Sequence, residues 1–308
     1  MQSAATNLMA RLSVRRFLPV LAVGAGMALA PSLAQAAPVT TDLQLWLDAS
    51  DVDGLGGQSF TDTWADKSGQ GNDVTQANAS LRPTYSSSGG ANNQAYFQFD
   101  GTQYLDDIGF DPGISTGGFT FFAVAQWDGA NNQFPPRVFS WGDSDENPSM
   151  QLRLASGSDN PTDFQWAMSG TGGGDGGLGP ITPGFGTVDV GTTYLATVLR
   201  DSGSVTGFLD GVAGLAGSGP TDLSTATNPL LRVGGRMDTD VVNWSGTISE
   251  ILIYNRTLSE SELNQTGFYL ADKYGIQTTY VPEPASLALM GLGGLALLLR
   301  RRGEHAGM

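Results

Sequence analysis

The chain has 308 residues, with 30 acidic against 15 basic side chains, one histidine and no cysteine. The absence of cysteine excludes disulfides, thiolate metal sites and cysteine nucleophiles. The histidine is His305, so residues 37–280 offer no imidazole for a Ser-His-Asp triad or a histidine-ligated zinc site. The same residues carry nine basic and 28 acidic side chains, and a net charge of −19 repels phosphate backbones and argues against nucleic-acid binding.

Residues 1–36 follow the order of a secretory signal peptide. A basic start precedes an apolar stretch over 17–30, and Ala34-Gln35-Ala36 provides a small-residue cleavage site. The basic residues are Arg11, Arg15 and Arg16. The apolar stretch is shorter than the roughly 20 residues of a membrane-spanning helix. The pattern therefore predicts export and cleavage after Ala36, through either the general secretory or the twin-arginine route.

Residues 37–280 are predicted to form one all-β domain. Glycine is abundant, and short segments with a period of two alternate with tight turns. We expect strands over 43–48, 96–99, 119–127, 150–154, 194–199, 205–209, 230–233 and 247–254. Two of them, 119–127 and 248–254, are apolar on both parities, which predicts a sheet that is covered on both faces. The glycine-rich stretch 170–179 is interpreted as a surface loop.

One helix is well signalled near the end of this domain. Ser259 and Glu262 form the pattern of a capping box, and Leu258 and Leu263 occupy the positions of a hydrophobic staple. Gly275 provides the stop. We expect this helix to pack on the β-structure rather than to carry chemistry.

Several segments in this order and spacing resemble a laminin-G-like domain. The resemblance covers roughly residues 40–277 and rests on Leu43–Asp51, Trp64–Gln76, Arg82–Tyr85, Phe97–Leu105, Thr197–Val212, Leu231–Arg236 and Trp244–Gly275. It implies a concanavalin A-like jelly roll made of two antiparallel sheets, one of them concave. It also implies that ligands bind at loop rims or on the concave face.

The segment 281–302 resembles a PEP-CTERM sorting signal of Gram-negative bacteria. Its three parts are Pro282-Glu283-Pro284, the apolar run 285–299 and Arg300-Arg301-Arg302. The resemblance implies recognition by an exosortase, cleavage near the Pro-Glu-Pro, and delivery from a membrane-tethered precursor to the cell surface or extracellular matrix. As a helix the apolar run reaches only about 22 Å, against a hydrocarbon core of about 30 Å. A transient stay in the membrane is therefore predicted, with 303–308 as a short cytoplasmic tail.

Some relatives of this architecture are glycoside hydrolases, which need two carboxylates across the scissile bond. The Glu-x-Asp-x-x-Glu string of the laminarinase-like branch is absent from this chain. Glu250 is on a predicted strand without a visible partner, Glu146 is in a loop, and Glu260 and Glu262 are at the helix start. We therefore expect a non-catalytic protein in adhesion or biofilm matrix association. The alternatives are a polysaccharide-active hydrolase whose acidic pair is assembled by folding, and a structural envelope protein without a ligand.

Hard oxygen ligands in loops suit calcium. The candidate calcium ligands are Asp143, Asp145 and Glu146, and two further acidic groups are Asp48, Asp51 and Asp53, and Asp238 and Asp240. The alternative interpretation is an acidic turn without metal, because aspartate favours turns regardless of metal.

A glycan site needs an aromatic platform beside hydrogen-bonding groups. Trp141, next to the acidic loop, and Trp166, before the glycine-rich stretch, are the candidates for exposure. The alternative is that both are packed in the core. Together the predictions describe an exported lectin-like protein that binds extracellular polysaccharide, with calcium as the expected cation.

Overall fold

The structure is a computed structural model. It describes residues 37–281 except 115–116, 131–134, 144–148, 156–162, 170–183, 221–222, 224–228 and 238–242. The predicted signal peptide, the Pro-Glu-Pro motif with its apolar run and arginines, and the C-terminal tail lie outside the described residues. Within the described part of the chain, no helix is long and apolar enough to cross a membrane.

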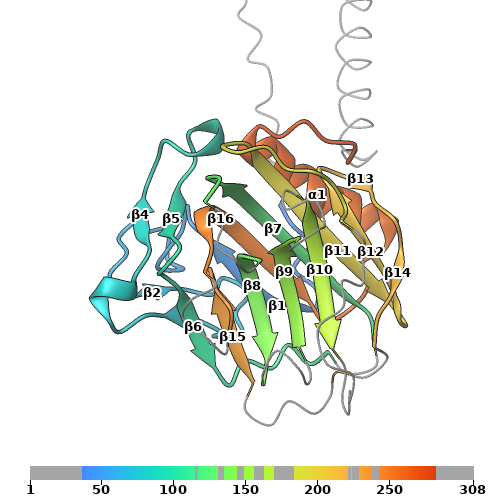
Figure 1. The fold of residues 1–308 in the computed structure, drawn as a ribbon, viewed down its shortest axis with the longest axis horizontal. Helices are drawn as coiled ribbons and strands as arrows, with labels where there is room; N and C mark the ends of the chain where they lie inside the picture. Colours follow the sequence, from blue (N-terminus) through green and yellow to red (C-terminus); the bar gives the residue numbers. More distant parts are fainter. Residues whose placement is uncertain are drawn as a thin grey trace, which may run out of the picture. The chain divides into compact units, whose positions relative to one another are not determined.

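The described chain forms two antiparallel sheets that stack face to face (Figure 1). Among the described residues the first sheet has nine strands: β1 (Leu43–Asp48), β4 (Thr84–Ser86), β5 (Tyr96–Asp100), β7 (Phe119–Trp127), β11 (Thr193–Asp201), β12 (Ser204–Leu209), β13 (Val212–Ala213), β14 (Gly217–Ser218) and β16 (Ser245–Tyr254). Its order is β13-β12-β11-β7-β16-β5-β4. The first half of β16 pairs with β5 and the second half with β1.

The second sheet has the order β10-β9-β8-β15-β6-β3-β2. Its strands are β2 (Thr63–Trp64), β3 (Val74–Thr75), β6 (Leu105–Ile108), β8 (Arg137–Gly142), β9 (Ser149–Leu154), β10 (Phe164–Ser169) and β15 (Leu230–Val233). Every strand predicted from the sequence lies within one of these elements, and the jelly-roll sandwich is confirmed. The prediction did not include the other eight strands of the described chain: β2, β3, β4, β6, β8, β10, β13 and β14. Two short 3₁₀ helices, η1 (Ala79–Leu81) and η2 (Ala91–Asn93), lie in the loops.

The main core lies between the two sheets and is built by alternation along each strand. On β7, Phe119, Phe121 and Ala123 point into this core, as do Phe164 and Trp166 on β10. Their sequence neighbours therefore face the opposite side of each sheet. Because the inward residues are large and aromatic, the sandwich closes without disulfides.

The outer face of the first sheet is also apolar and is covered by helix α1 (Glu260–Tyr274). Phe122 and Val124 on β7 and Leu252 on β16 belong to the same buried cluster as Leu263 and Leu270 of the helix. This explains why the strand 119–127 is apolar on both parities. The predicted helix boundaries are also confirmed. The capping box of Ser259 and Glu262 is formed, and Gly275 ends the helix in the left-handed region at φ 66°.

One turn of α1 holds the beginning of the described chain. Gln265 donates its Nε2 hydrogen to the carbonyl of Ala37 at 2.9 Å, and the backbone N–H of Val39 donates to Oγ1 of Thr266 at 3.2 Å. The hydroxyl of Tyr254 on β16 donates to the carbonyl of Val39 at 2.7 Å. The start of the predicted mature protein is thus fixed between the helix and the first sheet.

The same turn of α1 holds the end of the described chain. The backbone N–H of Val281 donates to Oδ1 of Asn264 at 3.2 Å, and the buried ring of Tyr280 packs on Gly267. Thr278 and Thr279 donate to the carbonyl of Asp210. The segment that precedes the Pro-Glu-Pro motif is therefore bound to the domain up to its last described residue.

Candidate functional site

The outer face of the second sheet is polar, unlike the outer face of the first. A row of laterally paired residues crosses six strands from β10 to β3: Ala167, Gln151, Ser140, Arg232, Asp106 and Thr75. A second row pairs Gln165, Arg153 and Arg137. Each of these residues alternates with a core residue, so their side chains share the face turned away from the first sheet. We call this set the polar face.

The side chains of the polar face are held in fixed positions. Arg232 binds Asp106 through two parallel hydrogen bonds of 2.8 and 2.9 Å, donates a third to the carbonyl of Arg236, and stacks 3.6 Å from the ring centroid of Tyr104. Arg137 donates from Nε to Oε1 of Gln151 at 2.7 Å. Both arginines are less than 7% exposed (6% and 3%). Ser140 and Gln151 are fully buried as well, so within these two rows the polar face reaches the surface only at its edge, at Asp106 and Thr75.

An open groove continues the first row of the polar face at β3 and β6. It has a volume of about 460 Å³ and is lined by Asp73, Thr75, Gln76, Ala77, Tyr104, Asp106, Asp107 and Ile108. Ile108 is 86% exposed and gives the groove an apolar contact surface. Burial, reinforced by the charges of Asp73 and Asp66, raises the pKa of Asp107 to about 6. We call this depression the β3–β6 groove.

A second groove of about 440 Å³ borders the end of the described chain. Its walls are Phe185, Gly186, Thr187, Leu209, Asp210, Val212, Gln277, Thr278 and Thr279. Burial raises the pKa of Asp210 to about 6, although the hydrogen bond that its carboxylate accepts from the N–H of Leu195 opposes the shift. This groove does not continue the polar face.

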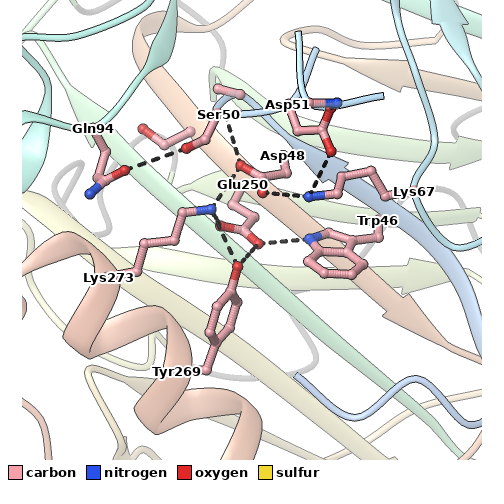
Figure 2. Close-up of polar contacts among 12 residues, drawn as sticks. Trp46, Asp48, Ser50, Asp51, Lys67, Gln94, Glu250, Tyr269 and Lys273 are labelled. Atoms are coloured by element: carbon pink, nitrogen blue, oxygen red, sulfur yellow. Dashed lines mark hydrogen bonds and ion pairs between the residues drawn. The ribbon is translucent and has the colours of Figure 1, made fainter. Parts of the chain in front are cut away.

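A buried cluster of charges lies between the first sheet and α1 (Figure 2). Asp48 on β1 and Glu250 on β16 are direct partners in the strand register. Lys273 of the helix places its Nζ 2.7 Å from Oδ1 of Asp48 and 2.7 Å from Oε2 of Glu250. Glu250 is fully buried, and the side chains of Asp48 and Lys273 are 5% and 8% exposed. We call these three residues the charge cluster.

Both lysines of the chain converge on one carboxylate. Lys67 lies 3.0 Å from Oδ2 of Asp48 and 3.1 Å from Asp51, while Lys273 holds Oδ1. Burial on its own would raise the pKa of Asp48, but the two lysines outweigh it and hold that pKa below its usual value. For Glu250, burial and the charge of Asp48 prevail over Lys273, so the pKa is raised.

Aromatic side chains complete the hydrogen bonding of Glu250. The indole Nε1 of Trp46 donates to Oε1 at 2.7 Å, and the hydroxyls of Tyr269 and Tyr274 donate to Oε1 and Oε2 at 3.1 and 2.9 Å. Burial, with the charge of Glu250, raises the pKa of both tyrosines, which keeps them protonated as donors. All the oxygens of the cluster are thus satisfied by protein groups.

Folding gives Glu250 the partner that the sequence did not reveal, namely Asp48. The two residues are 202 positions apart, so no local pattern could join them. A hydrolase needs its carboxylate pair to face a substrate. This pair lies beneath α1, and neither of the two grooves includes it. The sequence offered no local signal for this pair, because the burial of Lys273 follows only from the packing of the helix on the sheet, and a buried lysine is normally paired with an acid.

Of the two interpretations of Trp141 and Trp166, exposed platform or packed core, the structure shows the packed one. Trp141 is 1% exposed and donates its Nε1 hydrogen to the carbonyl of Phe110 at 2.7 Å. Trp166 is fully buried against the rings of Phe121 and Phe139. Both are on the parity that points between the sheets, where no sugar can stack on them. Among the described residues, the large apolar side chains that are exposed are Leu55, Ile108, Val190, Val212, Leu215 and Val281, none of them aromatic.

The carboxylates of the acidic group at 48–53 bind protein groups rather than a metal ion. Asp48 and Asp51 bind the lysines, and Asp53 accepts hydrogen bonds from the backbone N–H groups of Leu55 and Gly57. Within the described ranges, no group of three or more acidic or histidine side chains is arranged to hold a metal ion.

The predicted calcium ligands are only partly within the described chain. Asp143 follows the end of β8 and is half-buried. Asp145 and Glu146, as well as Asp238 and Asp240, lie outside the described residues. The calcium site at Asp143, Asp145 and Glu146 therefore stays a prediction.

The two stacked antiparallel sheets define an all-β protein of the sandwich class. A family profile described as the concanavalin A-like lectin/glucanases superfamily, of the laminin-G type, matches residues 92–264, more than half of the chain. The chain therefore belongs to this superfamily. A second profile, the PEP-CTERM protein-sorting motif, matches residues 281–302. The motif marks an exported protein that is processed at the membrane by an exosortase.

Solved structures of the same fold come from glycan-active and binding proteins. Domain 4 of an extracellular arabinanase from Geobacillus stearothermophilus, solved with arabinotriose, is 15% identical with a TM-score of 0.53, over 74% of this chain and 98% of that domain. The binding domain of Paraclostridial Mosquitocidal Protein 1 is 12% identical with a TM-score of 0.52, over 75% of this chain and 52% of that one.

A Trypanosoma rangeli sialidase is 18% identical with a TM-score of 0.49, and the match, over 79% of this chain, spans about a third of that enzyme (34%). A search of curated proteins found no match by sequence.

Proposed function

We propose that the protein is an exported, non-catalytic carbohydrate-binding protein that associates with polysaccharide at the cell surface or in the extracellular matrix of a Gram-negative bacterium. The observation that carries the proposal is the open β3–β6 groove at the edge of the polar face, where Thr75 and Ile108 are exposed and Asp106 and Asp107 are half-buried. Groups fixed by bidentate ion pairs lose little freedom when a ligand binds. The arabinanase domain of the same fold, solved with arabinotriose, supports a glycan as the ligand class.

The chemistry of the β3–β6 groove favours a neutral, hydroxyl-rich ligand. Its volume is within the roughly 300–1,000 Å³ of small-molecule sites. Thr75, Gln76, Asp106 and Asp107 provide hydrogen-bonding groups, and Ile108 provides an apolar patch for the hydrophobic face of a sugar ring. The body carries a net charge of −19, which repels uronate or sulfate groups unless a cation intervenes. Calcium at Asp143, Asp145 and Glu146 would serve as such a cation.

A glycan array tests this proposal. The secreted protein is applied with calcium and with a chelator, and we expect binding to neutral polysaccharides in both conditions and to acidic ones only with calcium. Thr75→Arg fills the groove from an exposed strand position, so it should abolish binding and leave the melting temperature unchanged. Thr84→Arg, at an exposed position on β4 of the other sheet, is the matched control. If no glycan is bound with calcium and none with the chelator, the proposal is refuted.

A second function, polysaccharide hydrolysis, is favoured by one observation. Asp107, with its pKa raised to about 6, lies in the same groove as Asp73 and Asp106. A carboxyl that remains partly protonated near neutral pH suits a general acid beside a second carboxylate. Release of reducing sugar from a polymer that the array identifies, abolished in Asp107→Asn, would establish this function and refute the non-catalytic one.

A further inference from the structure

The charge cluster places the amine of Lys273 directly beside the carboxylate of Asp48. Nζ of Lys273 lies 2.7 Å from Oδ1 of Asp48, and its second carboxylate contact is Oε2 of Glu250 at 2.7 Å. All three side chains are buried beneath α1 (Figure 2). A buried ion pair gains little stability over apolar packing, because desolvation costs about as much as the attraction returns. The cluster therefore calls for a reason beyond helix docking.

We propose that Lys273 and Asp48 form an intramolecular amide bond, with Glu250 transferring the protons. The ammonium of Lys273 passes a proton through Glu250 to Asp48, against the low pKa of Asp48, and this leaves a minor population with a neutral amine and a carboxylic acid. Nζ then attacks Cγ of Asp48 and forms the C–N bond. The extra proton on nitrogen moves through Glu250 to the departing oxygen, the C–O bond breaks, and one water molecule leaves. Glu250 ends in its starting state, so atoms and charges balance without any oxidant or other reactant.

The neighbouring groups occupy the positions that this reaction needs. The ammonium of Lys67 lies 3.0 Å from Oδ2 of Asp48, where negative charge develops when Nζ attacks Cγ. The backbone N–H of Ser50 donates to Oδ1 at 2.8 Å and fixes the plane of the carboxylate. Trp46 and Tyr269 hold Oε1 of Glu250, which leaves Oε2 directed at Nζ of Lys273.

Burial favours the product over the ion pair. Condensation replaces two opposite charges with one neutral amide, so the cost of keeping charges out of water disappears. The packed helix keeps water from the amide and opposes the reverse reaction. A Glu250 with raised pKa accepts and returns a proton more readily than an exposed glutamate does.

The proposed bond joins β1 near the start of the domain to α1 near its end. It closes a loop from residue 48 to residue 273, which contains nearly all of the described domain. A cross-link between distant residues restricts the unfolded chain, as a disulfide does. This exported protein has no cysteine, so the amide would provide the covalent staple that disulfides provide in other secreted domains.

Peptide mass spectrometry of the purified protein tests the inference. After denaturation and digestion with trypsin, we expect one linked species that is lighter than its two peptides by one water molecule. It joins the peptide that contains Asp48 and ends at Lys67 to the peptide that starts at Thr257. The second peptide continues past Lys273, because trypsin does not cut after an acylated lysine. Recovery of the unlinked peptide 257–273, with the Asp48 peptide at its sequence mass, would overturn the proposal.

Two variants separate the roles within the cluster. Lys273→Arg keeps a cation but removes the reactive amine, so it should give no linked species. Glu250→Gln keeps the size of the side chain and an acceptor for Trp46, and we expect loss of the linked species with the fold retained. A linked species at wild-type yield in Glu250→Gln would overturn the role of Glu250. The wild-type digest decides the existence of the bond even if neither variant folds, and it is independent of any glycan result.

Discussion

Gly267 of α1 lies directly against the ring of Tyr280, and a Cβ atom at position 267 would stand 2.4 Å from Cδ2 of that ring. No real Cβ tolerates such a contact, so glycine is needed here for close packing rather than for its backbone freedom. The contact fixes the last turn of the domain before the sorting motif. Helix α1 thereby holds the chain up to the start of the sorting motif.

Gly267→Ala should destabilise the protein although alanine is the better helix former. In an exposed helix the change would gain about 1 kcal/mol. Here overpacking against Tyr280 should outweigh this gain and give a net loss of about 1–3 kcal/mol, measured by urea unfolding. The double variant Gly267→Ala/Tyr280→Ala, compared with Tyr280→Ala, is the control, because alanine at 267 should then be stabilising. A stabilised Gly267→Ala single variant would contradict the packing.

Lys273→Met should be among the most damaging single changes in the helix. It leaves Asp48 and Glu250 buried without the side chain that neutralises them, and breaking one side of a buried pair costs about 3–5 kcal/mol, to which loss of the proposed amide would add. Lys67→Met, at a side chain that is 19% exposed, should cost clearly less. Urea unfolding of the two variants measures both losses. If the two variants lose the same unfolding free energy, the burial of Lys273 does not explain its contribution to stability.

Asp210→Asn should stabilise the protein above pH 6. Burial raises the pKa of Asp210 from 3.8 in the unfolded chain to about 6, so the folded protein holds the proton more tightly. The stability that this group contributes is present below pH 3.8 and is lost as the pH rises through about 6. Asparagine keeps the acceptor for the N–H of Leu195 and the positive φ of 53° without the charge.

The effect of Asp210→Asn should be about 1 kcal/mol at pH 7.5, a figure reduced for the partial exposure of the side chain. Melting temperatures of the variant and the wild type at pH 3.5 and 7.5 measure it. We expect no difference at the lower pH and a higher melting temperature of the variant at the higher pH. A gain of the same size at both pH values would show that the buried charge is not the cause.

How much of this structure the sequence predicted depends on how local each signal is. The helix from 260 to 274 was fully predicted, because Ser259, Glu262 and Gly275 act within a few residues of its ends. The sandwich was predicted because alternation along a strand needs no knowledge of its partners. The opposition of Asp48 and Glu250 was not predicted, since it depends on the pairing of the first and last long strands.

The sequence held a further signal that decides between the two interpretations of Trp141 and Trp166. Trp141 shares the parity of Phe139 on β8, and Trp166 shares that of Phe164 and Met168 on β10. Alternation therefore assigned both tryptophans to the core face. The prediction of exposure relied instead on their closeness to polar loops, which says nothing about the direction of a side chain. The same alternation identifies Gln151, Arg153 and Gln165 as members of the polar face.

Trp166→Ala distinguishes a core tryptophan from a sugar platform. The indole packs on Phe119, Phe121 and Phe139 between the sheets, so its removal leaves a large cavity. Truncation of a buried tryptophan costs about 3–5 kcal/mol, and we expect a loss of that size in urea unfolding. Trp166→Phe should lose less than half as much unfolding free energy as the alanine variant, because a ring still fills most of the space. Glycan binding of the folded Trp166→Phe protein should equal that of the wild type. Unchanged stability together with lost glycan binding would instead place the indole in the binding surface.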